Sequence, residues 1–202
     1  MNAPQTIYLK DYAPPAYLVD TVDLDISIHD DHARVGARMT MRRNPAGSAG
    51  SLKLDGEDLT LVSLSVNGRV LSEAEYRYAD QQLTIESVPD AFTFETVVTI
   101  APDSNTQLSG LYRSKDGYFT QCEAQGFRRI TFYPDRPDVM ARFTCTLHAD
   151  KERLPTLLSN GNPVASGDEE KIGGRLRHWA KWHDPFPKPA YLFACVLAKL
   201  DM

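Results

Sequence analysis

The chain has 202 residues, of which 42% are hydrophobic and 24% charged, a balance typical of a folded, water-soluble protein with a sizeable core. Its formal net charge of −5 lacks the basic excess of nucleic-acid-binding domains, so we expect no nucleic-acid partner. The sequence shows neither an apolar leader nor an 18-residue apolar run, so we expect no secretory signal, no membrane contact and a cytoplasmic location.

Alternating apolar and polar residues predict a β-hairpin near the start of the chain. In residues 21–28 the apolar side chains of Val22, Leu24, Ile26 and Ile28 fall on one face of a strand. The polar segment 29–32 follows, and residues 33–41 then repeat the alternation. Two such runs around a short polar turn are typical of a hairpin.

Further strands follow at intervals of about ten residues. The dipeptides Asp55-Gly56 and Asn67-Gly68 each supply the positive φ angles that tight hairpin turns need. Residues 91–102 read as a strand ended by Pro102, and residues 142–150 alternate again. We interpret the charged segment Asp168–Gly174 as an exposed loop.

Helical periodicity is almost absent from the sequence, with at most a short turn near Asp135 and Asp138. The spacing of strands and turns therefore predicts an all-β domain of the sandwich or multi-sheet type. We find no internal repeat and no linker, so residues 1–202 are expected to form one domain.

The histidines do not predict a metal site. His29 and His32 flank two aspartates at the predicted hairpin turn, where a solvated turn is the simpler interpretation. His178 and His183 fall on opposite faces of a predicted strand and cannot share an ion there. The sequence has no HExxH motif and no cysteine pair with zinc-ribbon spacing. We expect this chain to hold no metal of its own.

The cysteines do not predict nucleophilic catalysis. Cys122, Cys145 and Cys195 are odd in number and widely spaced, which favours reduced thiols over a disulfide framework. Glu123 follows Cys122 directly, and a neighbouring carboxylate should raise the pKa of a thiol. A small esterase that uses Cys122 stays open as a weaker alternative, which unchanged reactivity of Cys122→Ser would remove.

The segment 116–143 concentrates most of the candidate chemistry. If residues 117–125 are extended, Phe119, Gln121, Glu123 and Gln125 share one face. That face is either a solvated sheet surface or a receptor for an ammonium group, in which two amides flank one carboxylate.

The arginines and aspartates that follow have nearly balanced charge. We interpret them as a structural ion-pair network that holds the preceding strand still. The set comprises Arg128, Arg129, Asp135, Arg136, Asp138 and Arg142.

At these residues the sequence resembles a known family. The runs QCEAQGFRRI, YPDRPD and HDPFPKPAYLFA, together with the opening YLKDYAPPAYLVDTVDLDISI, closely resemble the N-terminal domain of bacterial aminopeptidase N enzymes. These are zinc-dependent alanyl aminopeptidases of the gluzincin type. The resemblance covers essentially the whole chain.

The resemblance implies an all-β, saddle-shaped domain that packs over a thermolysin-like catalytic domain. The GAMEN and HExxH motifs of that catalytic domain are absent from this chain. Zinc is therefore expected in the full-length enzyme and not in residues 1–202, which are expected to fold without hydrolysing peptides and to contribute no catalytic residue.

Two site residues carry over from the resemblance. The family's Q-x-E-A segment matches Gln121 and Glu123, which implies that Glu123 helps to bind the free α-amino group of a peptide and that Gln121 lines the first side-chain pocket. It also implies a cis peptide bond between Glu123 and Ala124. The implied partners are peptides with a free N-terminus and the catalytic domain.

A second hypothesis from another functional class stays open. The chain could be an independent all-β binding module that has kept the scaffold without the peptidase. Such a module should enclose Gln121 and Glu123 in a closed pocket, whereas a domain of a larger enzyme should expose the surface that its partner domain covers.

Overall fold

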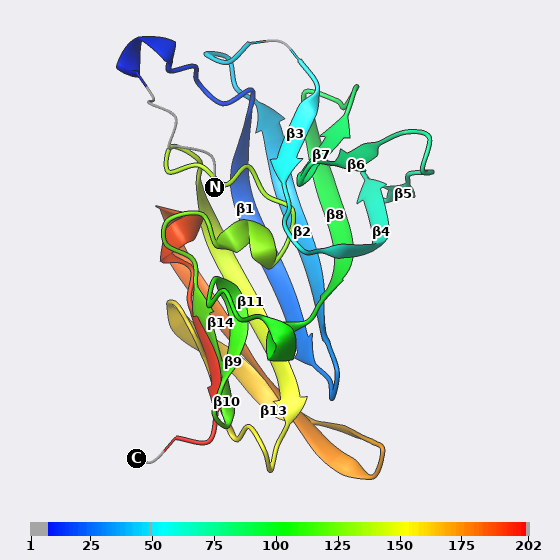
Figure 1. Ribbon diagram of the computed structural model, residues 1–202, viewed down its shortest axis with the longest axis vertical. Coiled ribbons are helices and arrows are strands. Elements are labelled where there is room, and N and C mark those ends of the chain that lie inside the picture. Colours follow the sequence, from blue (N-terminus) through cyan, green and yellow to red (C-terminus); the bar gives the residue numbers. More distant parts are fainter. Residues whose placement is uncertain (1–7, 49, 201–202) are drawn as a thin grey trace.

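The computed structural model describes residues 8–48 and 50–200 and consists almost entirely of β-strands (Figure 1). The strands of these residues form three sheets. Four short 3-10 helices connect them: η1 (Leu9–Asp11), η2 (Pro102–Ser104), η3 (Phe127–Arg129) and η4 (Ala190–Leu192). No helix of the described residues is long and apolar enough to span a membrane.

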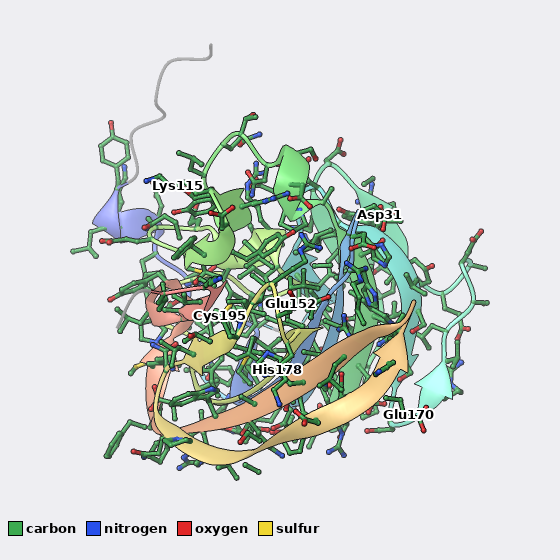
Figure 2. All side chains as sticks on the ribbon, turned by 90° about the horizontal axis from the view of Figure 1, so that it is seen from below. Asp31, Lys115, Glu152, Glu170, His178 and Cys195 are labelled. Carbon is green, nitrogen blue, oxygen red and sulfur yellow. The ribbon has the colours of Figure 1, made fainter. Side chains whose placement is uncertain are left out.

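The largest sheet has eight strands in the spatial order β13-β14-β11-β1-β2-β8-β4-β5. In chain order they are β1 (Tyr17–Ile28), β2 (Ala33–Arg43), β4 (Thr60–Val66), β5 (Arg69–Val70), β8 (Ala91–Ile100), β11 (Met140–Asp150), β13 (Asn162–Ile172) and β14 (Arg175–Pro189). Neighbouring strands run antiparallel, except that β1 and β11 run parallel. Figure 2 shows β13 and β14, in orange, curving beneath the rest of the molecule.

Two smaller sheets cover one face of this large sheet. The first has the order β12-β15-β10-β9, and the second has the order β3-β7-β6. Their strands are β3 (Leu52–Asp55), β6 (Arg77–Ala79), β7 (Gln82–Ile85), β9 (Gly110–Ser114), β10 (Gly117–Gln121), β12 (Thr156–Ser159) and β15 (Cys195–Ala198). In Figure 1, β9 and β10 lie over β11 and β14. The predicted all-β, multi-sheet, saddle-shaped fold is confirmed.

The hydrophobic core lies between the sheets because the strands of the large sheet are apolar on one face only. In β1 the side chains of Val22, Leu24 and Ile26 are buried, and the aspartates between Val22 and Ile26 are exposed. The hairpin predicted for residues 21–41 is confirmed by the pairing of β1 with β2. One continuous cluster of buried apolar residues joins all three sheets.

One of the two predicted glycine turns forms a hairpin. Asn67 and Gly68 connect β4 to β5 with φ angles of 52° and 75°. The turn predicted at Asp55-Gly56 is wrong, because β3 pairs with β7 and not with β4. A Cβ atom on Gly56 would lie 2.4 Å from the Phe132 ring, so this glycine serves close packing.

The loop predicted for Asp168–Gly174 is also wrong in most of its length. Residues 168–172 belong to β13, and only Gly173 and Gly174 form the turn to β14, with φ angles of 58° and 80°. β13 is an edge strand that is exposed on both faces. Its sequence therefore lacks the apolar alternation that reveals the other strands.

Candidate functional site

The extended face predicted for Phe119, Gln121, Glu123 and Gln125 is correct only in its first half. β10 ends at Gln121, and residues 123–126 form a turn. Glu123 and Gln125 are exposed like Gln121, but they are exposed because they belong to a turn and not because they alternate along a strand. Gln121 and Glu123 are thus brought together on an open surface at the end of a strand.

Close packing of two glycines closes the base of this turn. The Gly126 N–H donates to the Cys122 carbonyl at 2.8 Å. A Cβ atom on Gly126 would lie 2.3 Å from the Gln121 carbonyl oxygen and 3.0 Å from the Gly110 nitrogen. Gly110 has a φ of 74°, and a Cβ atom there would lie 2.6 Å from the Cβ of Arg129. Neither glycine leaves room for the turn to shift.

Glu123 presents an unpaired carboxylate. The Gln121 Nε2 donates to the backbone carbonyl of Glu123 at 3.2 Å, which orients the amide beside the turn. Within residues 8–48 and 50–200, the Glu123 carboxylate forms no hydrogen bond or ion pair. The peptide bond from Glu123 to Ala124 is cis, as the family resemblance implies. The site therefore offers a free carboxylate next to a fixed amide.

Arg128 connects η3 to a buried aspartate. Its Nε and its backbone N–H both donate to the Asp135 carboxylate, at 3.2 and 3.1 Å, and its guanidinium lies 3.3 Å from Asp55 Oδ2. Burial raises the pKa of Asp135, although the hydrogen bonds from Arg128 act in the opposite direction. The Asp135 side chain is only 3% exposed. Arg128 therefore belongs to the scaffold.

Arg129 connects the other side of η3 to two distant segments. Its guanidinium nitrogens lie 2.8 Å from Glu57 Oε2 and 2.6 Å from Asp58 Oδ2. Nη2 also donates to Gln107 Oε1 at 2.7 Å. These three partners lie far from Arg129 in sequence, and no local pattern marks them, so the sequence does not predict them.

The predicted ion-pair network is confirmed for most of its members. Arg136 forms a pair with Asp138 at 2.7 Å and also donates to the Ala13 carbonyl at 2.8 Å. Arg142 forms no ion pair with any residue in the described part of the chain. The network therefore fixes η3 and the segment that follows it, and none of its ion pairs involves the Glu123 carboxylate.

Buried aromatic rings pack around Phe127, the residue that directly follows the turn. Phe127 makes edge-to-face contacts with Tyr133, Phe143 and Phe193 at centroid distances of 5.0–5.7 Å. Cys122 is also buried, and burial raises the pKa of its thiol to about 12, with a smaller contribution from Asp135. The predicted direction of the shift is correct, but its predicted cause, Glu123, is wrong.

The histidines take part in local hydrogen bonds. His29 and His32 stack at 4.7 Å in the β1–β2 turn. His178 Nε2 contacts the Leu154 carbonyl at 2.8 Å, and His183 Nδ1 contacts the Thr144 hydroxyl at 3.2 Å. Among the described residues, no three His, Cys, Asp or Glu side chains converge as metal ligands would.

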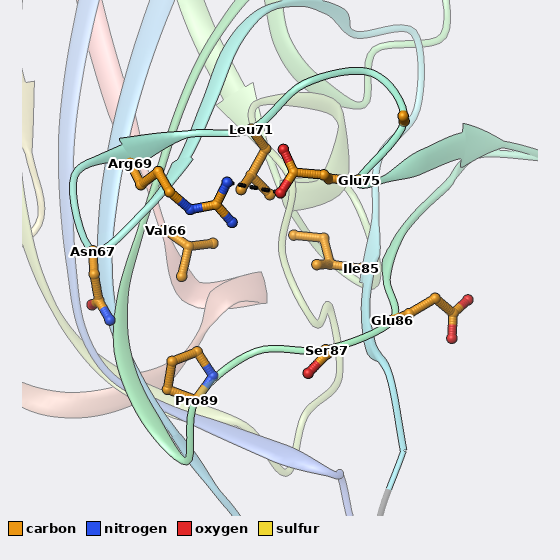
Figure 3. A pocket seen from close by; sticks show the side chains of 10 residues that line it. Val66, Asn67, Arg69, Leu71, Glu75, Ile85, Glu86, Ser87 and Pro89 are labelled. Atoms are coloured by element: carbon orange, nitrogen blue, oxygen red, sulfur yellow. Dashed lines mark hydrogen bonds and ion pairs between the residues drawn. The ribbon is translucent and has the colours of Figure 1, made fainter.

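A separate hollow of about 580 Å³ lies between β5 and β7 (Figure 3). The ion pair between Arg69 and Glu75, at 2.7 Å, crosses it. Apolar side chains such as Val66 and Ile85 line it. Gln121 and Glu123 are not among the residues that line this hollow.

Comparisons with known proteins agree with the fold and with the sequence resemblance. The family model of the peptidase M1 N-terminal domain matches residues 13–192. Aminopeptidase N from Caulobacter vibrioides is 48% identical over 201 residues, which cover 100% of this chain and 23% of the relative. Aminopeptidase N from Escherichia coli is 45% identical over 199 residues, covering 98% and 22%. The chain thus spans less than a quarter of the length of these relatives.

Solved structures show the same fold. Aminopeptidase A from Legionella pneumophila, in complex with aspartic acid, matches with a TM-score of 0.87 and 37% identity, over 96% of this chain and 22% of that one. The M1 zinc metallopeptidase from Deinococcus radiodurans matches with a TM-score of 0.73 and 14% identity, over 94% and 43%. The second likeness concerns the fold alone.

Proposed function

Because the chain belongs to the peptidase M1 N-terminal domain family, we propose that it is the N-terminal domain of a zinc aminopeptidase, that Glu123 helps to bind the free α-amino group of peptide substrates, and that Gln121 lines the pocket for their first side chain. The observation that carries this proposal is the unpaired, exposed Glu123 carboxylate beside the fixed Gln121 amide. All of residues 1–202 are assigned to this domain.

The chemistry of the pair suits an ammonium group. A carboxylate accepts charge-assisted hydrogen bonds from an ammonium, and these are about twice as strong as neutral ones. Gln121 uses its Nε2 on the Glu123 carbonyl, so its Oε1 is left to accept a further N–H. An internal peptide segment has no such charge and would leave Glu123 desolvated and unpaired, which disfavours its binding.

Exposed apolar side chains fit a domain that is covered by a larger enzyme. Met140 and Leu192 are 52% and 50% exposed. Met140 pairs with Pro189, the residue directly before η4, so both apolar side chains lie at the same end of the β11–β14 pair. We assign this part of the surface to contact with the catalytic domain. Gln121 and Glu123 lie in no closed pocket, which favours this assignment over an independent binding module.

The zinc chemistry belongs outside the described residues. These residues provide no ligand set for zinc, and the sequence has no HExxH motif. Residues 1–202 contribute substrate register in this proposal and are inactive alone. Detectable, chelator-sensitive hydrolysis of alanyl p-nitroanilide by the purified 202-residue protein would contradict it. We further propose that the enzyme works in the cytoplasm on peptides, without a membrane or nucleic-acid partner.

The role of Glu123 is tested by Glu123→Gln in the full-length enzyme that carries this domain. We expect kcat/KM for alanyl p-nitroanilide to fall about 10- to 100-fold, which is the loss of one hydrogen bond between charged groups. The matched control is Glu73→Gln, an exposed glutamate between β5 and β6 that should leave kcat/KM unchanged. An unchanged kcat/KM in Glu123→Gln would refute the proposed role.

A further inference from the structure

We propose that Arg129 is a positioning residue for Glu123: its guanidinium fixes the C-terminal base of the turn and thereby sets where the carboxylate meets the substrate amine. This inference rests on the proposed function of Glu123. It adds a residue that touches neither substrate nor metal and acts only through the backbone of the turn.

The first step of the argument is the way Arg129 is held. Its three acceptors, Glu57, Asp58 and Gln107, come from the β3–β4 connection and from the segment before β9. The Arg129 side chain is only 12% exposed. A planar guanidinium with five N–H donors can serve three acceptors at once, whereas a lysine ammonium is a point charge on a flexible stem. Arg129 thus fixes η3 to two separate parts of the domain.

The second step is the direct connection from Arg129 to the turn. The Arg129 N–H donates to the Gly126 carbonyl at 3.1 Å, and the Gly126 N–H in turn donates to the Cys122 carbonyl at 2.8 Å. Glu123 follows Cys122 within this closed turn. Gly110 packs against the Arg129 Cβ on one side, and its backbone pairs with Gln121 on the other. A displacement of Arg129 would therefore move both ends of the turn.

The third step is that no side-chain hydrogen bond to another part of the domain holds the middle of the turn. The side chains of Glu123 and Gln125 form no hydrogen bond within the described ranges, and there the Gln121 side chain donates only to the Glu123 carbonyl within the turn itself. The position of the carboxylate consequently depends on the two ends of the turn. The first end is held by the pairing of β10 with β9, and the second is held through Arg129.

Arg128, the neighbouring arginine, has a different role. It neutralises the buried Asp135, so its removal would leave an unpaired buried charge and destabilise the whole domain. Arg129 instead contacts Asp58, whose side chain is 70% exposed. Loss of Arg129 should therefore displace the turn while leaving the domain folded, which makes its effect measurable.

The test is a double-mutant cycle in the full-length enzyme with alanyl p-nitroanilide as substrate. We expect Arg129→Gln to lower kcat/KM about 10- to 100-fold, because a misplacement of about 1 Å is enough for such a loss. In the Glu123→Gln background, the same substitution should cause no further loss, because Arg129 acts only through Glu123. The control Arg69→Gln removes an exposed ion pair on β5 and should change neither background.

The outcomes separate this inference from the function on which it rests. If Glu123→Gln lowers kcat/KM and Arg129→Gln lowers it equally in both backgrounds, the positioning role is refuted and the proposed function stands. If Glu123→Gln has no effect, both fall. Should Arg129→Gln fold poorly, Asp58→Asn removes one acceptor only. It is expected to lower kcat/KM about 2- to 5-fold in the Glu123 background alone, and an equal loss in both backgrounds would overturn the inference.

Discussion

Gly126→Ala should destabilise the protein for a purely steric reason. The φ and ψ angles of Gly126 are −84° and −15°, which alanine adopts without strain. The added Cβ, however, would lie 2.3 Å from the Gln121 carbonyl oxygen and 2.9 Å from the Cys122 Cα. Both atoms belong to the backbone, so no side chain can rotate away. Overpacking of this kind costs about 1–3 kcal/mol, and the lower entropy of the unfolded alanine chain offsets about 0.5 kcal/mol.

The net loss of about 1.5 kcal/mol is measurable by urea unfolding followed by circular dichroism. With an m-value of about 3 kcal/mol/M for a chain of this size, the midpoint should fall by about 0.5 M. The matched control is Gly36→Ala in β2, where the new Cβ would lie 3.6 Å from the Asp25 Cβ and 3.9 Å from its carbonyl oxygen, both ordinary van der Waals distances. The free energy of unfolding of Gly36→Ala should be about 0.5–1 kcal/mol higher than that of the wild type. A Gly126→Ala midpoint equal to that of the wild type would refute the packing described for the turn.

Two further predictions concern titratable groups. His148 contacts Glu169 through Nδ1 at 2.5 Å and Asp25 through Nε2 at 3.0 Å. Burial is the largest single influence on the pKa of His148 and lowers it. The hydrogen bonds to the two carboxylates together outweigh burial, so the pKa of His148 is raised. The folded state therefore binds this proton more tightly than the unfolded state does. The resulting stabilisation is complete below the unfolded pKa of about 6.5 and is lost as the pH rises through the folded pKa. The urea midpoint of His148→Gln should therefore vary less with pH above 6.5 than that of the wild type, and parallel curves would contradict this. Burial also raises the pKa of the Cys122 thiol to about 12. A disulfide reagent at pH 8 should therefore leave this thiol unmodified in the native protein and modify it in urea, which peptide mapping would show. Fast modification of Cys122 in the native protein would refute its burial.

The sequence predicts where the strands of this fold lie in the chain better than it predicts which strands pair with each other. Alternation marks residues 21–28 and 33–41 correctly because each strand has one buried and one exposed face. The same alternation says nothing of which strand lies beside which, so the parallel pairing of β1 with β11 could not be foreseen. The edge strand β13 was missed because neither of its faces is buried.

In the candidate site too, the sequence identifies residues but does not predict the contacts that position them. Gln121 and Glu123 are marked by the family resemblance, and their exposure follows from the structure. The bend after Gln121 depends on contacts between Gly126 and Gly110, which are not neighbours in sequence. The partners of Arg129, among them Asp58, belong to other strand connections. Long-range contacts of this kind leave no local pattern in the sequence.

The parallel pairing of β1 with β11 has a consequence for how the protein is made. Thr21 lies beside Arg142, so β1 leaves the ribosome long before its central partner is synthesised. Until then β1 pairs with β2 alone, and along its other edge the seven residues that later pair with β11 present unpaired backbone with a row of apolar side chains. An open apolar edge of this length recruits other chains. A nascent or truncated chain that ends before Met140 should therefore aggregate and need chaperone protection, and solubility should improve once β11 covers this edge of β1.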